Sequence, residues 1–230
     1  MQIIPAKTPR FVKTLFPNLV WSIATRKKEI YLTFDDGPTP KITEWVLEEL
    51  KKHNAKATFF CIGNNIEKYP EIFKQIIDGK HSVGNHTHNH LKGWKHKTKT
   101  YINDVLKTEI LIDTKYKQLN SKTTDLTIEQ LKIENWNLKL FRPPYGKFKA
   151  KQSKQLQKLG YKIIMWDVLS YDWDANVSKE NCFKNSTSKT KEGSIIVFHD
   201  SVKASKNLKY TLPKVLEYYS KKGFAFRPIK

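Results

Sequence analysis

The sequence contains 230 residues, of which 39% are hydrophobic and 12% aromatic. This length and composition allow one large buried core without disulfides and exclude a disordered chain. The formal net charge of +20 favours contact with anionic surfaces. Only four of the basic residues are arginine, the residue on which nucleic-acid grooves rely at their contact points, so we expect a solvated lysine-rich surface and no specific nucleic-acid partner.

The cysteines and the N-terminal segment bear on the cellular compartment. Cys61 ends the apolar run ATFFC, where a buried thiol is expected, and Cys61 and Cys182 form neither a disulfide framework nor a paired metal motif. Pro17 and Asn18 interrupt the apolar centre of the N-terminal segment, which is unfavourable for a secretion signal. No run reaches the roughly eighteen apolar residues that span a bilayer. We therefore expect a cytoplasmic protein.

Residues 1–28 are expected to form an arm packed on a single domain of residues 29–230. Within that domain short apolar runs alternate with stretches of helical periodicity, and Thr39 is expected to cap the first helix. In chain order, the expected elements are strand 29–34, helix 42–54, strand 55–63, helix 70–80, strand 81–86, helix 101–119, strand 138–144, helix 149–160, strands 161–168 and 193–200, helix 211–223 and strand 224–229. Residues 118–137 break this rhythm and are expected to be an insertion. The alternation predicts an α/β fold with a mainly parallel sheet, either a (β/α) barrel or an open doubly wound sheet.

Polar side chains suited to metal binding and proton transfer follow five of the expected strands. They are Asp35 and Asp36 in TFDDGP, His86 and His90 in HTHNH, Arg142 and Tyr145 in RPPYG, Asp172 and Trp173 in SYDW, and His199 and Asp200 in FHD. Because loops at the carboxyl ends of parallel strands share one face of the sheet, we expect these groups to converge.

A metal site is the simplest use of the histidine-rich motif. His86 and His90 are four residues apart, so a helical or tightly turned segment would place both imidazoles on one side and turn His88 away. Two imidazoles and one carboxylate leave open coordination positions for water and substrate, as in catalytic zinc sites. Asp35 or Asp36 would supply the carboxylate. Neighbouring side chains diverge at a strand end, so one aspartate would bind the metal and the other would accept a proton.

Taken in order, the five motifs TFDDGP, HTHNH, RPPYG, WDVLSYDW and IVFHD resemble those of the polysaccharide deacetylases, or NodB-homology domains, of carbohydrate esterase family four. The resemblance covers residues 29 to about 228. It implies a distorted (β/α) barrel with about seven parallel strands. It also implies a metal-dependent hydrolase that removes N-acetyl groups from an N-acetylhexosamine-containing glycan, such as a chitin oligomer or peptidoglycan. The implied cofactor is a divalent metal, with zinc preferred over cobalt, manganese or nickel.

The resemblance further implies a role for each matching residue. These are Asp35 as the general base, Arg142 as its partner, Asp36, His86 and His90 as metal ligands, His199 as the general acid, Asp172 as the carboxylate that orients it, and Tyr145 and Trp173 as the lining of the sugar pocket, with the Tyr145 backbone N–H binding the oxyanion. Two positions depart from the family pattern. Leu91 replaces the proline that usually follows the last histidine, and Leu169 replaces the first aspartate of the fourth motif. The insertion at 118–137 leaves the identity of the glycan open.

Three other functions are compatible with these residues. The same site would attack an ester more easily than an amide, so an O-acetyl esterase is one alternative. An aspartate with two histidines is also the ligand set of non-haem iron(II) oxygenases, which would consume oxygen and release no acetate. A non-catalytic relative that binds glycans or polyanions through the positive charge is the third, and it would show steep salt dependence without hydrolysis.

Overall fold

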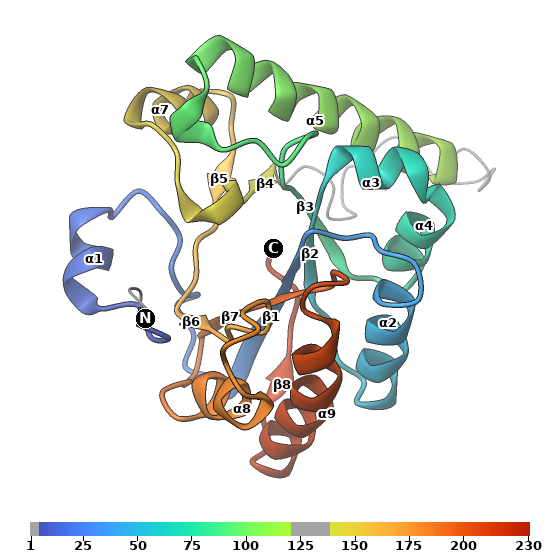
Figure 1. Ribbon diagram of the computed structural model, residues 1–230, viewed down its shortest axis with the longest axis vertical. Helices are drawn as coiled ribbons and strands as arrows, with labels where there is room; N and C mark the ends of the chain where they lie inside the picture. Colours follow the sequence, from blue (N-terminus) through green and yellow to red (C-terminus); the bar gives the residue numbers. More distant parts are fainter. Residues whose placement is uncertain (1–4, 121–138) are drawn as a thin grey trace.

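The computed structural model describes residues 5–120 and 139–230. At its centre, seven strands follow one another in the order β5-β4-β3-β2-β1-β7-β6, and β8 pairs with the start of β1 (Figure 1). Every pairing between these strands is parallel. The strands are β1 (Glu29–Asp35), β2 (Thr58–Cys61), β3 (Ser82–Asn85), β4 (Leu140–Phe141), β5 (Lys162–Ile163), β6 (Val168–Leu169), β7 (Ile195–His199) and β8 (Ala225–Phe226). The expected parallel sheet of about seven strands is confirmed.

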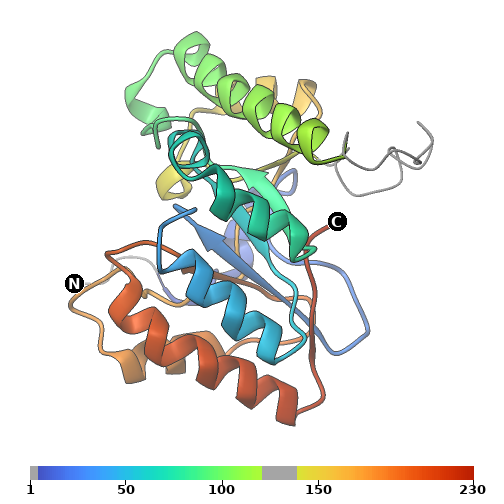
Figure 2. The same ribbon diagram turned by 90° about the vertical axis from the view of Figure 1, so that its right-hand side faces the viewer.

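The helices other than α1 form one layer outside the curled sheet (Figure 2). Their packing neighbours run α7-α5-α3-α4-α2-α9-α8, which follows the order of the strands beneath them. These helices are α2 (Thr43–Lys52), α3 (Gly63–Lys68), α4 (Pro70–Asp78), α5 (Thr98–Asn120), α7 (Ala150–Lys158), α8 (Lys179–Thr187) and α9 (Ser205–Lys221). One helical layer around a curled parallel sheet is the distorted (β/α) barrel rather than the open doubly wound sheet. None of the helices in the described ranges is long and apolar enough to cross a membrane.

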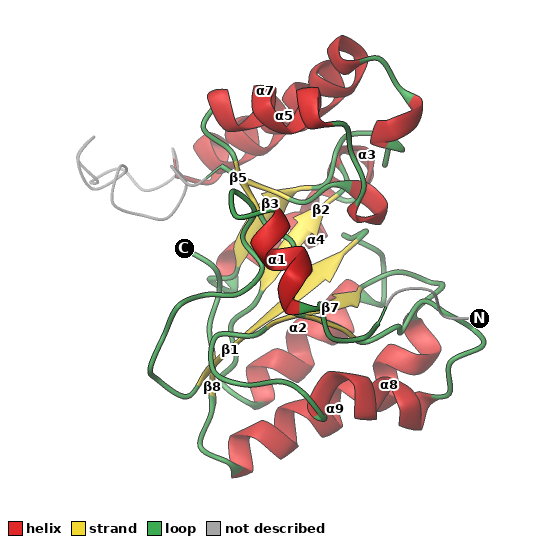
Figure 3. Cartoon of the chain, turned by 90° about the vertical axis from the view of Figure 1, so that its left-hand side faces the viewer, coloured by secondary structure: helices red, strands yellow, loops and turns green. Residues whose placement is uncertain are grey.

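The N-terminal arm lies where the barrel is open, between edge strands β5 and β6. Its short helix α1 (Arg10–Leu15) covers this side in Figure 3. The Val20 N–H donates to the Ile163 carbonyl at 2.9 Å, and the Leu169 N–H donates to the Ala6 carbonyl at 2.7 Å. Asp167 is fully buried between the two edges and pairs with Lys7 and Lys13. The two edge strands do not pair with each other, and the arm therefore provides hydrogen-bond partners for the backbone at both edges.

Alternation along β1 separates the hydrophobic core from the interior of the barrel. Ile30, Leu32 and Phe34 are fully buried in the cluster that packs against the helices. The rings of Phe59 and Phe198 stack against Phe34 at centroid distances of 5.0 and 6.0 Å. Since successive side chains of a strand point to opposite faces, Thr33 and Asp35 face the barrel interior. The carboxylate of Asp35 thus stands at the end of β1, inside the barrel rim.

Several local expectations were wrong. In place of one strand over residues 161–168, the chain forms the two short strands β5 and β6. The segment between them pairs with the arm instead, because the Met165 N–H donates to the Val20 carbonyl at 2.7 Å. Helices α1, α3 and α8 were not expected, although Ser178 caps α8 by accepting the Asn181 N–H at 3.1 Å. The Thr39 side chain caps no helix; α2 begins at Thr43, whose hydroxyl accepts the Thr39 N–H at 2.7 Å. The expected insertion at 118–137 begins in α5 and otherwise lies outside the described residues.

Both cysteines lie in the described part of the chain. Cys61 and Cys182 are free thiols and both are buried, so the expected buried thiol at the end of β2 is confirmed.

Candidate active site

Asp35 is held by a buried arginine inside the barrel. The Arg142 Nη1 group donates to Asp35 Oδ1 at 2.8 Å and to Thr33 Oγ1 at 2.7 Å. The other guanidinium nitrogens donate to the backbone carbonyls of Ile164 and Met165, and Arg142 is fully buried. A buried charge needs this degree of pairing, since an unpaired one is strongly destabilising. The geometry leaves Asp35 Oδ2 free of this ion pair.

Asp36 turns away from its neighbour in a tight loop. Its φ of 80° lies in the left-handed region, which is uncommon for residues other than glycine. The following Gly37 N–H donates to Asp200 Oδ1 at 3.1 Å, and a Cβ at Gly37 would lie 2.0 Å from Asp200 Oδ2. The Thr43 hydroxyl donates to the same carboxylate at 2.5 Å. The fully buried Asp200, whose pKa burial raises to about 7, therefore fixes the turn that presents Asp36.

The loop after β3 brings His86 and His90 to the same side. Thr87 and His90 have φ values of 65° and 51°, so the chain is tightly turned rather than helical. The Asn85 side chain accepts the Thr87 N–H at 2.8 Å. On α5, the Asp104 carboxylate accepts the N–H groups of residues 88 and 89 at 2.8 and 3.0 Å. These contacts fix a loop that has no regular secondary structure.

The three candidate ligands face one another. One ligand atom each from Asp36, His86 and His90 lies within 4.8 Å of the other two. Asp36 Oδ1 is 3.7 Å from His86 Nε2 and 3.3 Å from His90 Nε2. His86 Nδ1 donates to the Arg142 carbonyl at 2.8 Å, which directs the Nε2 lone pair towards Asp36. The donor set and this outer hydrogen bond fit a catalytic divalent metal such as zinc.

Burial acting on His86 and the charges around Asp36 favour the forms of these two side chains that bind metal. Burial lowers the pKa of His86 to about 4, so its imidazole is neutral at physiological pH. Burial alone would raise the pKa of Asp36, but the surrounding histidines His90, His199 and His86 outweigh it and hold that pKa well below its usual range. Neutral imidazoles and an ionised carboxylate are the metal-binding states of these side chains.

His88 points away from the cluster, as the sequence predicted. Its Nε2 atom lies 2.8 Å from Lys107 Nζ and 3.6 Å from Glu67 Oε2. His88 therefore contributes to the packing between α3 and α5 and not to the candidate metal site.

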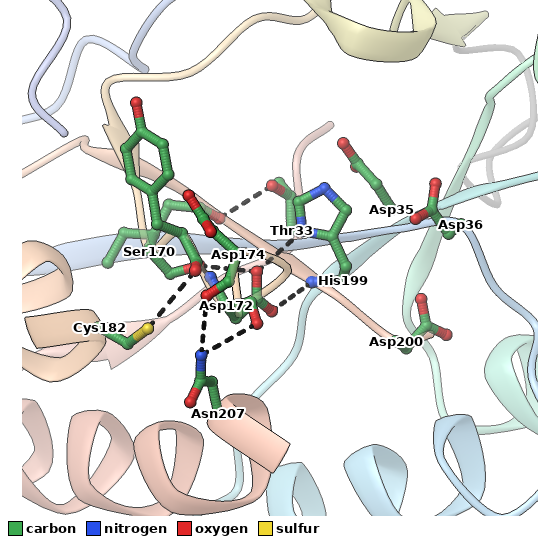
Figure 4. Close-up of polar contacts among 12 residues, drawn as sticks. Thr33, Asp35, Asp36, Ser170, Asp172, Asp174, Cys182, His199, Asp200 and Asn207 are labelled. Atoms are coloured by element: carbon green, nitrogen blue, oxygen red, sulfur yellow. Dashed lines mark hydrogen bonds and ion pairs between the residues drawn. The ribbon is translucent and has the colours of Figure 1, made fainter. Parts of the chain in front are cut away.

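On the other side of the rim, Asp172 holds His199. Its two carboxylate oxygens accept the His199 Nδ1–H at 2.9 Å and the His199 backbone N–H at 2.7 Å. Figure 4 shows Asp172 between His199 and the side chains of Ser170 and Asn207, with Asp35, Asp36 and Asp200 beyond the imidazole. Burial alone would lower the pKa of His199, but the Asp172 carboxylate offsets it, and the pKa rises to about 9. The imidazole is therefore protonated at neutral pH.

These groups line one pocket of about 460 Å³. Asp35, Asp36, His86, His90 and His199 all reach it. Its walls are formed by Pro143, Tyr145, Gly146, Trp166, Leu169, Tyr171, Trp173, Val197 and Lys203. A mainly apolar and aromatic wall around a few polar groups is usual for a small-molecule or sugar site.

Each residue predicted from the motifs lies at this rim or supports it. Tyr145 packs on the His90 ring at a centroid distance of 4.8 Å, and Trp173 packs on the His199 ring at 4.6 Å. Leu169 lines the pocket at the position where many family members carry aspartate.

The motifs gave no role to Asp104, Asp200 or Trp166. The FHD motif contains Asp200, but only the fold shows that it holds the loop after β1. Nothing in the sequence around Asp104 predicted its contact with the histidine loop, whereas Trp166 is part of the fourth motif and was available as a signal.

A curled parallel sheet with titratable groups at one rim is the arrangement of the (β/α)-barrel enzymes. The model of the polysaccharide deacetylase family matches residues 22–164. The chain belongs to this family.

The names of similar proteins are consistent with membership of this family. The chain is 34% identical over 175 residues to a peptidoglycan-N-acetylglucosamine deacetylase of Bacillus cereus, a match that covers 76% of this chain and 57% of the relative. A second Bacillus cereus protein of that name is 30% identical over 212 residues, with 90% of this chain and 89% of the relative covered. The chain thus spans little more than half of the first relative's length and most of the second's.

A solved structure shows the same fold over almost the whole chain. It is the crystal structure of a peptidoglycan N-acetylglucosamine deacetylase in complex with 4-naphthalen-1-yl-N-oxidanyl-benzamide, which is 30% identical in sequence. The TM-score is 0.79, and the superposition covers 96% of this chain and 95% of that one.

Proposed function

We propose that this protein is a metal-dependent hydrolase that removes N-acetyl groups from the N-acetylhexosamine units of a glycan, with peptidoglycan, the polymer named for its relatives, as the first candidate. The observation that carries the proposal is the meeting of two sets of groups in one pocket. The cluster of Asp36, His86 and His90 faces the same space as Asp35 and His199. A metal site, a base and an acid are the groups that amide hydrolysis requires.

Asp36, His86 and His90 would hold the metal. When bound there, a divalent cation supplies a Lewis acid that lowers the pKa of water and polarises the acetyl carbonyl. The two imidazoles and one carboxylate leave positions for water and substrate. The hydrogen bond from His86 to the Arg142 carbonyl at 2.8 Å fixes the orientation of that imidazole.

Asp35 accepts the proton of the attacking water. The carboxylate faces the pocket, and its ion pair with Arg142 fixes its orientation through Oδ1. As the new bond between the water oxygen and the acetyl carbon forms, negative charge develops on the carbonyl oxygen. We assign the Tyr145 backbone N–H as a donor to that oxygen.

His199 donates the proton that the leaving amine requires. The Asp172 carboxylate fixes the proton on Nδ1 and stabilises the imidazolium, so the Nε2–H is available to the substrate. Transfer of this proton to the nitrogen accompanies cleavage of the carbon–nitrogen bond, which releases acetate and leaves a free amine on the sugar. Trp173 packs on His199 and, with Tyr145, would line the sugar pocket.

Family membership favours hydrolysis over the oxygenase alternative. The Asp35–Arg142 pair and the His199–Asp172 pair also favour it, since they provide a base and an acid for hydrolysis. An oxygenase would use neither pair for proton transfer and would consume oxygen.

Acetate release tests the proposal. Purified protein loaded with zinc is incubated with N-acetylglucosamine oligomers, with peptidoglycan strands and with an O-acetylated glycan, and acetate is measured with and without a chelator. The expected result is release of N-acetyl groups from at least one glycan, which stops when the chelator is added. Release from O-acetylated glycan alone would support the esterase instead. Metal-loaded protein that releases no acetate from any of these glycans would overturn the proposal.

A further inference from the structure

Two aromatic side chains form a corner at the edge of the pocket. Tyr145 and Trp94 meet edge to face, with ring centroids 5.6 Å apart at 83°, and they leave 51% and 37% of their surfaces exposed. Tyr145 also lines the pocket and packs on His90. We call Trp94 and Tyr145 the aromatic corner. It continues the pocket outward from the candidate metal ligands.

Contacts between the two loops that carry Trp94 and Tyr145 hold the aromatic corner in place. Trp94 lies in the 3₁₀ turn η1 (Gly93–Lys95) and Tyr145 in the turn η2 (Pro144–Gly146). The fully buried Gln152 joins their two loops: its Nε2 group donates to the Gly93 carbonyl at 2.9 Å, and its Oε1 accepts the Lys149 N–H at 2.8 Å. A Cβ at Gly93 would lie 3.1 Å from the Lys147 carbonyl, so only glycine allows this close approach without displacement. The two exposed rings are therefore preorganised.

Two lysines stand over these rings. Lys92 Nζ lies 5.2 Å from the centroid of the Tyr145 ring, and Lys147 Nζ lies 5.8 Å from that of Trp94. Within residues 5–120 and 139–230, no carboxylate forms an ion pair with either lysine. A third exposed lysine, Lys203, lines the pocket. The edge of the site thus combines apolar rings with positive charge that the described protein does not neutralise.

We propose that the aromatic corner, with Lys92 and Lys147, binds a carboxylate-bearing sugar next to the N-acetylhexosamine that is deacetylated. This inference rests on the proposed function and names the substrate class: an acidic glycan whose neighbouring residue carries a carboxylate, in preference to a neutral polymer. The apolar C–H face of a pyranose stacks on an exposed aromatic ring, and tyrosine and tryptophan provide such surfaces at little entropic cost. The lysine ammonium groups then meet the carboxylate on the sugar.

The charge contacts set the size of the expected preference. Exposed ion pairs contribute about 0.2–1 kcal/mol each, so two lysines give a preference of about two- to thirtyfold for the carboxylated glycan. Because both lysines are exposed, salt screens them, and the preference should decline as ionic strength rises. Stacking on Trp94 does not depend on charge and should be nearly independent of salt. The two contributions can therefore be measured separately.

The test compares two glycans that differ only in the carboxylate. One is a strand in which N-acetylglucosamine alternates with N-acetylmuramic acid, and the other is the same strand with its carboxyl groups reduced to alcohols. The zinc-loaded protein should show a kcat/KM for acetate release about two- to thirtyfold higher with the carboxylated strand at low salt. Affinity for both strands is also measured by calorimetry with chelator present, where the expected preference is in the same direction.

Variants separate charge from stacking. K92A/K147A should remove most of the preference, while W94A should raise KM for both strands by about three- to tenfold. K222A is the matched control, because Lys222 Nζ lies 4.2 Å from the Tyr218 ring centroid. That pair lies near β8, which joins the start of β1, whereas the pocket lies at the end of β1. K222A should keep the preference of the unaltered protein.

The outcomes distinguish this inference from the proposed function. Equal affinity and equal kcat/KM for the two strands would overturn the carboxylate subsite while acetate release still supported the deacetylase. A binding preference that K92A/K147A removes, without acetate release from any glycan, would support the subsite and overturn the deacetylase. A preference that K92A/K147A and K222A change equally would overturn the assignment to the aromatic corner.

Discussion

Both oxygens of the Asp172 carboxylate bind His199, one through the imidazole Nδ1–H at 2.9 Å and the other through the backbone N–H at 2.7 Å. The double contact fixes the position and the tautomer of the imidazole. It also accounts for the raised pKa of His199, since the carboxylate stabilises the protonated ring and offsets the effect of burial.

Substitution D172N should therefore change the pH profile. If His199 is the acid, activity persists up to its pKa of about 9 and falls as pH rises through that value. Without the negative charge, the pKa should move down towards the ordinary histidine value of about 6.5, and the alkaline limb of kcat/KM should move with it. The measurement is acetate release across pH at fixed metal concentration.

Substitution D174N provides the control for that shift. Asp174 lies in the same loop but its side chain caps the Asn176 N–H at 2.9 Å and makes no hydrogen bond to His199. The alkaline limb of kcat/KM should lie at the same pH in D174N as in the unaltered protein. If D172N also left the limb in place, His199 could not be the group whose proton is used.

The adjacent aspartates should give opposite results for metal binding. D35N should bind one equivalent of zinc and lose about 10²–10⁴ in rate, because it removes the base and leaves the ligand cluster intact. D36N should lose the zinc itself, since Asp36 supplies the only carboxylate in the cluster of described residues. Metal content after dialysis, measured with acetate release, separates the two roles. Equal zinc content in the two variants would contradict the assignment of Asp36 to metal binding and of Asp35 to proton transfer.

The local pattern of the sequence was sufficient to predict the main frame of the site. Asp35 and Asp36 follow a buried strand, and alternation along that strand already implied that their side chains diverge. Likewise, the spacing of His86 and His90 predicted a shared side, although the tight turn between them depends on left-handed residues that no periodicity reveals. Strand ends are local features, so a single sequence can indicate them.

The sequence alone could not predict the contacts that support the site, because these contacts join segments far apart in the chain. Asp104 reaches the histidine loop from α5, and Gln152 joins two loops more than fifty residues apart, without a sequence signal at either position. The segment 161–168 was expected as one strand because it is apolar. In the fold it passes between two sheet edges and pairs with the N-terminal arm at Val20. Such tertiary partners override local propensity.

Histidine substitutions within the same loop should separate metal binding from packing. H90A should weaken zinc binding by more than the roughly 10–100-fold loss that substitutions outside the ligand set cause. H88N should bind zinc normally, because His88 faces Lys107 and Glu67 instead of the cluster. Competition with a chromogenic chelator measures both affinities. Equal weakening by the two substitutions would show that the loop acts as a whole and that His90 has no special role.

The turn after β1 should depend on Asp200, although Asp200 is not a candidate metal ligand. D200A would leave the Gly37 N–H and the Thr43 hydroxyl without their buried acceptor, at a cost of about 1–3 kcal/mol for each unpaired group. Because Gly37 adjoins Asp36, zinc affinity should also fall, by about 10–100-fold as for other supporting residues. Urea unfolding and chelator competition measure the two effects. D78A is the control, since Asp78 pairs with Lys74 on an exposed face of α4 and should change stability by less than about 0.5 kcal/mol. If D200A unfolded at the same urea concentration as D78A and bound zinc equally well, the turn would be maintained by other contacts.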